Sequence, residues 1–265
     1  MPHISGWLFF AAGVLYLVAA VVSSAVLFTK RREIIGWISR AAMVGLAVHL
    51  AGLVFRGFER GGFPAFTLDE ILFLSAFMGI SVYLVALFKY RLEVIGLIIL
   101  PLVVALMAVT FLIPDEPTQL TAGWRMSLRA VHIVPAVLGV GCLFLTFATS
   151  VCYLVQERGL KEHRPLRTFQ SLPSLERCDR ISYISLGWGF AFLTLVVITG
   201  ALTNRYMRGD FSWVLREKWA LLAWSLFAIV IYDRVFVGRW RGRLSAYLSI
   251  IGFLAIIMRM VGIGS

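Results

Sequence analysis

Long apolar stretches recur along the chain, separated by short polar or basic segments. Eight of them are long enough to cross the roughly 30 Å of hydrocarbon in a bilayer. They are Trp7–Thr29, Ala41–Phe55, Ile71–Phe88, Val94–Ile113, Ala130–Val155, Ile181–Leu202, Trp219–Val237 and Leu244–Val261. A backbone inside lipid must satisfy its own hydrogen bonds, and the sequence lacks the alternating pattern of a membrane barrel. We therefore expect an all-α polytopic membrane protein with about eight transmembrane helices, in a single domain over residues 1–265.

Composition supports the same conclusion. Of the 265 residues, 60% are hydrophobic and the mean hydropathy is +0.88, whereas soluble domains are about 45–50% apolar. Little of the chain remains for a soluble domain. The net charge of +11 does not indicate nucleic-acid binding, because 16 of the 25 basic residues lie in alternate loops. The positive-inside rule makes those loops cytoplasmic. Membrane lipid is the expected partner of the apolar spans.

The order of charges around the first span sets the predicted orientation. No positive residue precedes this apolar run, and Lys30, Arg31 and Arg32 follow it. A cleaved signal peptide has the opposite order. We expect a multi-pass protein of a bacterial inner (cytoplasmic) membrane with both termini outside.

The sequence contains no CxxC pair, Gly-rich phosphate loop, nucleophile elbow or metal-spaced cluster. This predicts a protein that is not catalytic on its own. One outer connector, Gly200–Trp219, is longer than a plain turn needs to be. Its aromatic residues are Tyr206, Phe211, Trp213 and Trp219, and its basic residues are Arg205, Arg208, Arg216 and Lys218. Such a set suits either an interfacial aromatic belt or a site for a flat, anionic, amphipathic ligand.

Two of the four histidines are candidate ligands. His49 lies inside the second span, where an ionisable residue is a functional candidate, although it can equally bond a backbone carbonyl of a neighbouring helix. His132 opens the fifth span on the side of the aromatic connector, where a neutral imidazole can ligate haem iron or serve a structural role. His163 falls on the opposite side and His3 on a terminus.

Two connectors have features of their own. Gly61, Gly62 and Pro64 predict a turn before the third span, and Thr67 with Glu70 forms a capping box that suffices to explain the glutamate. The longest inner loop, 156–180, mixes basic and apolar residues, as an ordinary loop, a surface helix or a partner site would.

Three blocks resemble one family, the polytopic cytochrome c assembly proteins of the CcsA and HemX type, which are related to CcmC. RGFERGGFPAFTLDEILFLS keeps Arg56, Phe63, Pro64 and Glu70 of a family block, and ISLGWGFAFLTLVVITGAL is similar to a second. His132 matches the family's outer haem-ligand histidine. The connector falls on the tryptophan-rich haem-binding segment, which is matched by Gly209, Phe211, Trp213, Arg216, Glu217, Trp219 and Ala220.

The chain departs from the family pattern at several positions. Gly62 replaces a histidine, Val214 and Leu215 replace an Asp-Pro pair, and Tyr232 replaces an intramembrane histidine. The family's last outer histidine has no counterpart in the sequence, and His49 has no place in the family motif.

The resemblance implies a protein of cytochrome c biogenesis that binds or relays haem at its outer (periplasmic) face. His132 would ligate the haem iron. Trp213, Trp219 and Phe211 would cover the porphyrin, and Arg205, Arg208 or Arg216 would meet its propionates, with His49 as a further candidate ligand. The implied partners are a second membrane subunit, as in a cytochrome c haem lyase, and apocytochrome c. The alternative is a HemX-like accessory or regulatory protein whose haem site is degenerate or lost.

Overall fold

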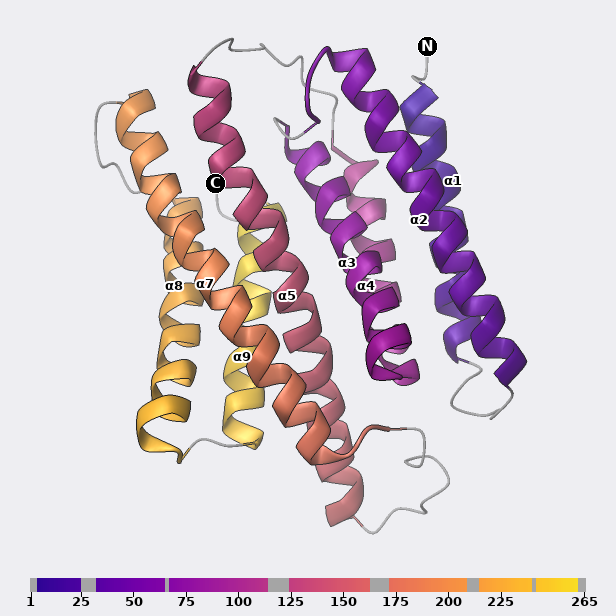
Figure 1. Cartoon of the computed structure of the whole chain (residues 1–265), viewed down its shortest axis with the longest axis vertical. Helices are drawn as coiled ribbons and strands as arrows, with labels where there is room; N and C mark the ends of the chain where they lie inside the picture. The colour runs from indigo at the N-terminus through magenta and orange to yellow at the C-terminus, as the bar shows by residue number, and fades with distance from the viewer. Residues whose placement is uncertain are drawn as a thin grey trace. The chain divides into compact units, whose positions relative to one another are not determined.

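The computed structural model describes residues 4–24, 32–64, 67–113, 124–162, 172–208, 215–239 and 242–261. Within these ranges all regular structure is helical (Figure 1). The long helices are α1 Ile4–Ser24, α2 Arg32–Arg60, α3 Leu68–Tyr90, α4 Gly96–Thr110, α5 Trp124–Lys161, α7 Leu175–Arg208, α8 Leu215–Tyr232 and α9 Arg243–Val261. A short 3₁₀ turn, η2 Glu93–Ile95, precedes α4, and a π-helical turn, η3 Asp233–Val237, follows α8. Eight candidate spans in the described ranges are long and apolar enough to cross a membrane, which confirms the predicted fold class.

Contacts group these helices into two compact units, one holding α1–α4 and the other α5–α9. In each unit, successive helices pack together and the last helix returns to pack against the first. The expectation of one domain over 1–265 stays a prediction.

In the first unit, α1 and α2 approach closely because two glycines of α2 make room for aromatic side chains of α1. A Cβ on Gly45 would lie 2.6 Å from Tyr16 Cε1, and one on Gly52 would lie 2.8 Å from Phe9 Cε1. Both aromatic side chains are fully buried. Small residues that let helix backbones approach are typical of membrane helix pairs.

We expect Gly45→Ala to lower the stability of the protein by about 1–3 kcal/mol, because the added methyl must displace the buried Tyr16 ring. Thermal unfolding in detergent measures this. Gly36→Ala is the matched control, because this glycine lies on the same helix and an added methyl group would meet nothing within 4 Å. The control should melt at the parent temperature or slightly above, since alanine favours helix more than glycine does. Equal melting of the two variants would contradict close packing at Gly45.

A buried cluster of charges joins the end of α2 to the start of α3. Arg56 Nη2 lies 2.7 Å from Asp69 Oδ2, and Arg56 Nε lies 3.6 Å from Glu70 Oε1. Arg60 Nε is 3.7 Å from the same Glu70 oxygen. The Thr67 backbone N–H also donates to Glu70 Oε2 at 3.3 Å, which is one bond of the predicted capping box. The cap is confirmed, but it does not suffice to explain Glu70, which also pairs with two arginines.

The chain between these helices turns as predicted at Gly61, which has a φ of 69° that favours glycine. The Gly62 N–H closes the turn by donating to the Gly57 carbonyl at 3.0 Å. At the same end of the unit, the Glu59 carboxylate accepts from the Ser5 backbone N–H and hydroxyl, which holds the first turn of α1 against α2. Polar contacts therefore fix one end of the first unit.

In the second unit, α5 and α7 pack antiparallel along most of their length (Figure 1). Hydroxyl pairs cross the interface, Thr146 to Ser185 at 2.9 Å and Ser150 to Ser182 at 3.2 Å. Further along, a Cβ on Gly139 would meet Phe192 Cβ at 3.1 Å. From Thr146–Ser185 to Gly139–Phe192, seven residues back along α5 match seven forward along α7, so one register holds over this part of the interface.

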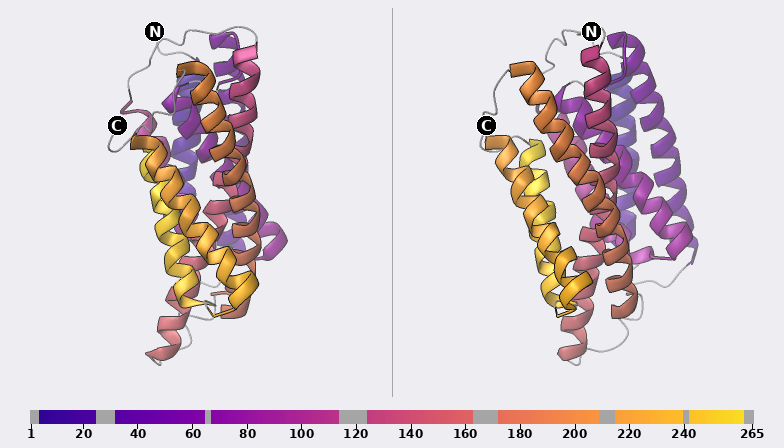
Figure 2. Two further views of the ribbon diagram at one scale, coloured as in Figure 1. Left: turned by 90° about the vertical axis from the view of Figure 1, so that its left-hand side faces the viewer. Right: turned by 60° about the vertical axis from the view of Figure 1, so that its left-hand side comes forward.

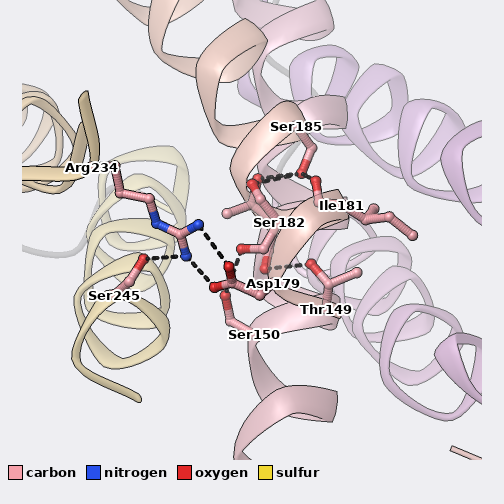
Figure 3. A network of polar contacts seen from close by, with 9 residues as sticks. Thr149, Ser150, Asp179, Ile181, Ser182, Ser185, Arg234 and Ser245 are labelled. Carbon is pink, nitrogen blue, oxygen red and sulfur yellow. Dashed lines mark hydrogen bonds and ion pairs between the residues drawn. The ribbon is translucent and has the colours of Figure 1, made fainter. Parts of the chain in front are cut away.

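An ion pair ties three helical segments together at the end of this unit where α5 and α8 finish. Figure 3 shows Arg234, from the π-helical turn after α8, reaching Asp179 of α7 with both terminal nitrogens. The same guanidinium donates to Ser245 Oγ of α9 at 3.2 Å and lies over the Tyr183 ring. The arginine is 8% exposed and the aspartate 26%, so the pair is well shielded from solvent.

Helices α5 and α7 run past the apolar stretches that predict them. The loop expected over 156–180 is therefore wrong in extent, since α5 continues to Lys161 and α7 begins at Leu175. Figure 2 shows the last turns of α5 extending beyond the start of α9. Ion pairs four residues apart, Arg158 with Glu162 and Lys161 with Glu157, support these turns outside the apolar region. The outer connector shortens similarly, because α7 reaches Arg208 and α8 starts at Leu215.

Candidate functional site

The second unit brings four helix ends together where α5 and α8 begin and α7 and α9 finish. His132 lies eight residues into α5, at this end of the unit. Its side chain is partly exposed. Trp219, in the first turns of α8, is also partly exposed. The helices thus place the predicted ligand and one predicted aromatic residue at the same end of one unit.

A hydrogen bond to α7 determines which nitrogen of His132 is free. The imidazole Nδ1 lies 3.0 Å from the Thr199 hydroxyl oxygen. That hydroxyl has one proton, which it donates to the Leu195 carbonyl at 2.6 Å. Thr199 can therefore only accept from His132, so Nδ1 carries the proton. The Val196 carbonyl, another acceptor, is also near the ring. It follows that Nε2 keeps its lone pair, as a metal-binding imidazole requires.

Two neighbours of His132 complete the site. The ring packs on Gly200, where a Cβ would come within 3.2 Å of imidazole Cε1. Arg259, in the last turn of α9, interacts electrostatically with the imidazole. A guanidinium there suits a carboxylate of a bound ligand. Sequence reasoning did not assign Thr199, Gly200 or Arg259 to the site, although Thr199 and Gly200 lie in the ISLGWGFAFLTLVVITGAL block that carries the family resemblance.

The other predicted haem contacts are placed only in part. Arg205 and Arg208 lie in the last turns of α7 and Arg216 in the first turn of α8, at the same end of the unit as His132. Their contacts with haem propionates stay a prediction. Phe211 and Trp213 lie outside the described residues.

His49 belongs to the first unit and has different surroundings. Its side chain is fully buried, and Nδ1 lies 3.3 Å from the Tyr16 hydroxyl. The rings of Phe9 and Phe77 lie edge-on to the imidazole, with centroids 5.5 and 5.7 Å away. The Phe73 backbone is close to the ring, although Nε2 makes no hydrogen bond of good geometry. This packing fits the structural alternative for His49 better than a ligand role.

The described residues hold no group of three or more His, Cys, Asp or Glu side chains that could bind a bare metal ion. A ligand that brings its own metal in a macrocycle needs only an axial ligand from the protein. His132 offers such a nitrogen. The donor set of this site therefore fits haem.

Comparisons with known proteins identify the family of the chain. A family model described as cytochrome c assembly protein matches residues 65–265. The cytochrome c biogenesis protein CcsA of Chlamydomonas reinhardtii is 28% identical over 223 residues, covering 80% of this chain and 61% of its own length. CcsA of Guillardia theta is 27% identical over 78% of this chain and 75% of its own length. CcsA of Synechococcus sp. (strain CC9902) is 26% identical over 96% of this chain and 91% of its own length.

These relatives are CcsA proteins, which favours the biogenesis role over the HemX-like accessory alternative. The matched region contains His132, Thr199 and both ends of the aromatic connector. The chain belongs to the cytochrome c assembly protein family.

Proposed function

We propose that this multi-pass membrane protein acts in cytochrome c biogenesis by binding haem at the His132 end of its second unit and presenting it for transfer. The observation that carries the proposal is the hydrogen bond from His132 Nδ1 to Thr199. Because Nδ1 carries the proton, the lone pair of Nε2 is free to bind a metal. Family membership and the CcsA relatives support the biological setting. The haem held at this site would be the group that is later attached to the cytochrome.

The residues of this chain would bind and orient. His132 would serve as axial ligand, and Thr199 would hold its proton on Nδ1 and fix the ring plane. Arg259, together with Arg205, Arg208 or Arg216, would meet the propionates. Trp219, Trp213 and Phe211 would cover the porphyrin faces. The protein would supply no bond-breaking chemistry of its own, so a second membrane subunit and apocytochrome c are its expected partners.

Absorption spectroscopy of the detergent-purified protein, with and without added hemin, tests this function. A Soret band that saturates at one haem per chain is the expected result. A protein that takes up no hemin in either oxidation state would contradict the proposal.

The proposed location is a bacterial inner membrane, with the His132 end facing outward. The alternating basic loops support this orientation. We expect a cysteine introduced by Asp210→Cys to react with an impermeant maleimide in intact cells. A cysteine introduced by Pro165→Cys should react only after the membrane is opened. Both variants need a parent in which Cys142, Cys152 and Cys178 are alanine. The opposite labelling pattern would place His132 on the cytoplasmic side.

A further inference from the structure

At the end of the second unit opposite His132, α5 and α9 leave a half-open groove of about 420 Å³. Its lining changes in character along α5. Leu154 and Val155 form its apolar part, and Arg158 and Lys161 follow one to two turns later on the same helix. Arg243 and Tyr247 of α9 form the facing wall. A lining that passes from apolar to cationic toward a helix end suits an amphiphile with an acidic head group.

The charges of the groove are incompletely balanced. It contains three cations and two carboxylates. Glu162 accepts from Arg158 at 2.6 Å, and Glu157 accepts from Lys161 at 2.6 Å. Among the described residues, no carboxylate lies within salt-bridge distance of Arg243, whose guanidinium stands over the Tyr247 ring 5.6 Å from its centroid. Arg243 is exposed and interacts with the neutral Tyr247 side chain and, at longer range, with Glu157, so its guanidinium can also contact a phosphate.

The surrounding sequence points to the same partner. This end of the unit carries the basic loops, so it faces the cytoplasmic leaflet under the positive-inside rule. Anionic lipids of that leaflet attract Lys and Arg at helix ends, and basic pockets between transmembrane helices bind their head groups. The cations of the ion pairs in the groove are mostly solvent-exposed, Arg158 at 76% and Lys161 at 62%, so the pairs are weak and a phosphate can compete for both cations.

We propose that this groove is a binding site for an anionic glycerophospholipid of the inner leaflet. The lipid phosphate would lie between Arg243 and Arg158, and an acyl chain would follow Leu154 and Val155 into the bilayer. Lipid held there would bridge α5 and α9, two helices that also reach the His132 end. The site is separate from the proposed haem site and does not depend on it.

Native mass spectrometry of the detergent-solubilised protein, titrated with dioleoyl phosphatidylglycerol, tests the proposal. We expect a single saturable site that dioleoyl phosphatidylcholine fills far more weakly. Arg243→Gln and Arg158→Gln should each weaken phosphatidylglycerol binding about fivefold, and the double variant more than tenfold. Glu157→Gln should tighten it, because Lys161 is then freed from its ion pair.

Lys89→Gln is the matched control, since this exposed lysine also lies over a tyrosine ring, that of Tyr90, but is not part of the groove. It should leave the affinity unchanged. Loss of binding in the control to the same extent as in Arg243→Gln would show nonspecific charge attraction and overturn the proposal. Displacement of the lipid by millimolar inorganic phosphate would also overturn it, in favour of a free-anion site. Unchanged far-ultraviolet circular dichroism verifies that each variant is folded.

Discussion

Replacing His132 by alanine is expected to abolish the low-spin haem spectrum of the purified protein. Iron–imidazole coordination is directional and depends on one nitrogen, whereas contacts to a porphyrin face are spread over several aromatic rings. Because Thr199 holds the proton of His132 on Nδ1, only Nε2 can coordinate the iron. Hemin titration followed by the Soret and visible bands measures the loss. Trp213→Phe should weaken haem retention without changing the type of spectrum.

Thr199→Val separates ligation from packing, because it keeps the size of the side chain and removes the hydroxyl acceptor for Nδ1–H, leaving only the Val196 carbonyl nearby. Losing such a partner typically weakens metal binding by about 10–100-fold. The low-spin spectrum should therefore survive at a higher hemin concentration. His49→Ala serves as the histidine control and should bind haem like the parent. If His49→Ala loses haem while His132→Ala retains it, the assignment of the site to the second unit is wrong.

Replacing Arg56 by methionine is expected to destabilise the protein by about 3–5 kcal/mol, as removal of one partner from a buried ion pair does. Asp69 and Glu70 would then remain as neighbouring carboxylates with 6% and 2% of their side chains exposed. Arg60 Nε lies 3.7 Å from Glu70 Oε1, a longer approach than the 2.7 Å between Arg56 and Asp69, so it does not take the place of the Arg56–Asp69 pair. Thermal unfolding in detergent measures the effect.

Two further variants make the Arg56 prediction specific. Combining Arg56→Met with Asp69→Asn and Glu70→Gln removes the uncompensated charges and should restore most of the lost stability. Lys161→Gln removes a pair whose lysine is 62% exposed, so no measurable change is expected. If Arg56→Met melts like Lys161→Gln, the buried cluster contributes nothing to folding.

Hydropathy predicts the eight helices well because lipid allows few alternatives to a helix. The positions of their ends are less predictable, since ion pairs such as Lys161 with Glu157 extend a helix beyond the apolar region. The capping box at Thr67 is readable because its two partners are three residues apart. Contacts between segments far apart in the sequence cannot be predicted from residue spacing.

The candidate site illustrates this difference. Position relative to the membrane and the family resemblance select His132, but its tautomer depends on Thr199, which is 67 residues away. Similarly, the spacing of Thr67 and Glu70 explains only one interaction of Glu70. Its pairing with Arg56 depends on how the chain turns at Gly61. For His49 the sequence left a ligand role and a structural role open. The phenylalanine side chains packed around it favour the structural role.

The register between α5 and α7 links His132 to the middle of the helix pair. From the hydroxyl pair Thr146–Ser185, fourteen residues back along α5 and fourteen forward along α7 lead to His132 and Thr199. At 1.5 Å per residue this is about 21 Å. Sliding one helix along the other would separate the hydroxyl pair and also remove the acceptor that leaves Nε2 free. By thermodynamic linkage, a ligand that binds Nε2 best in this register would oppose such sliding, so occupancy at His132 would stiffen the helix pair as far as Thr146 and Ser185.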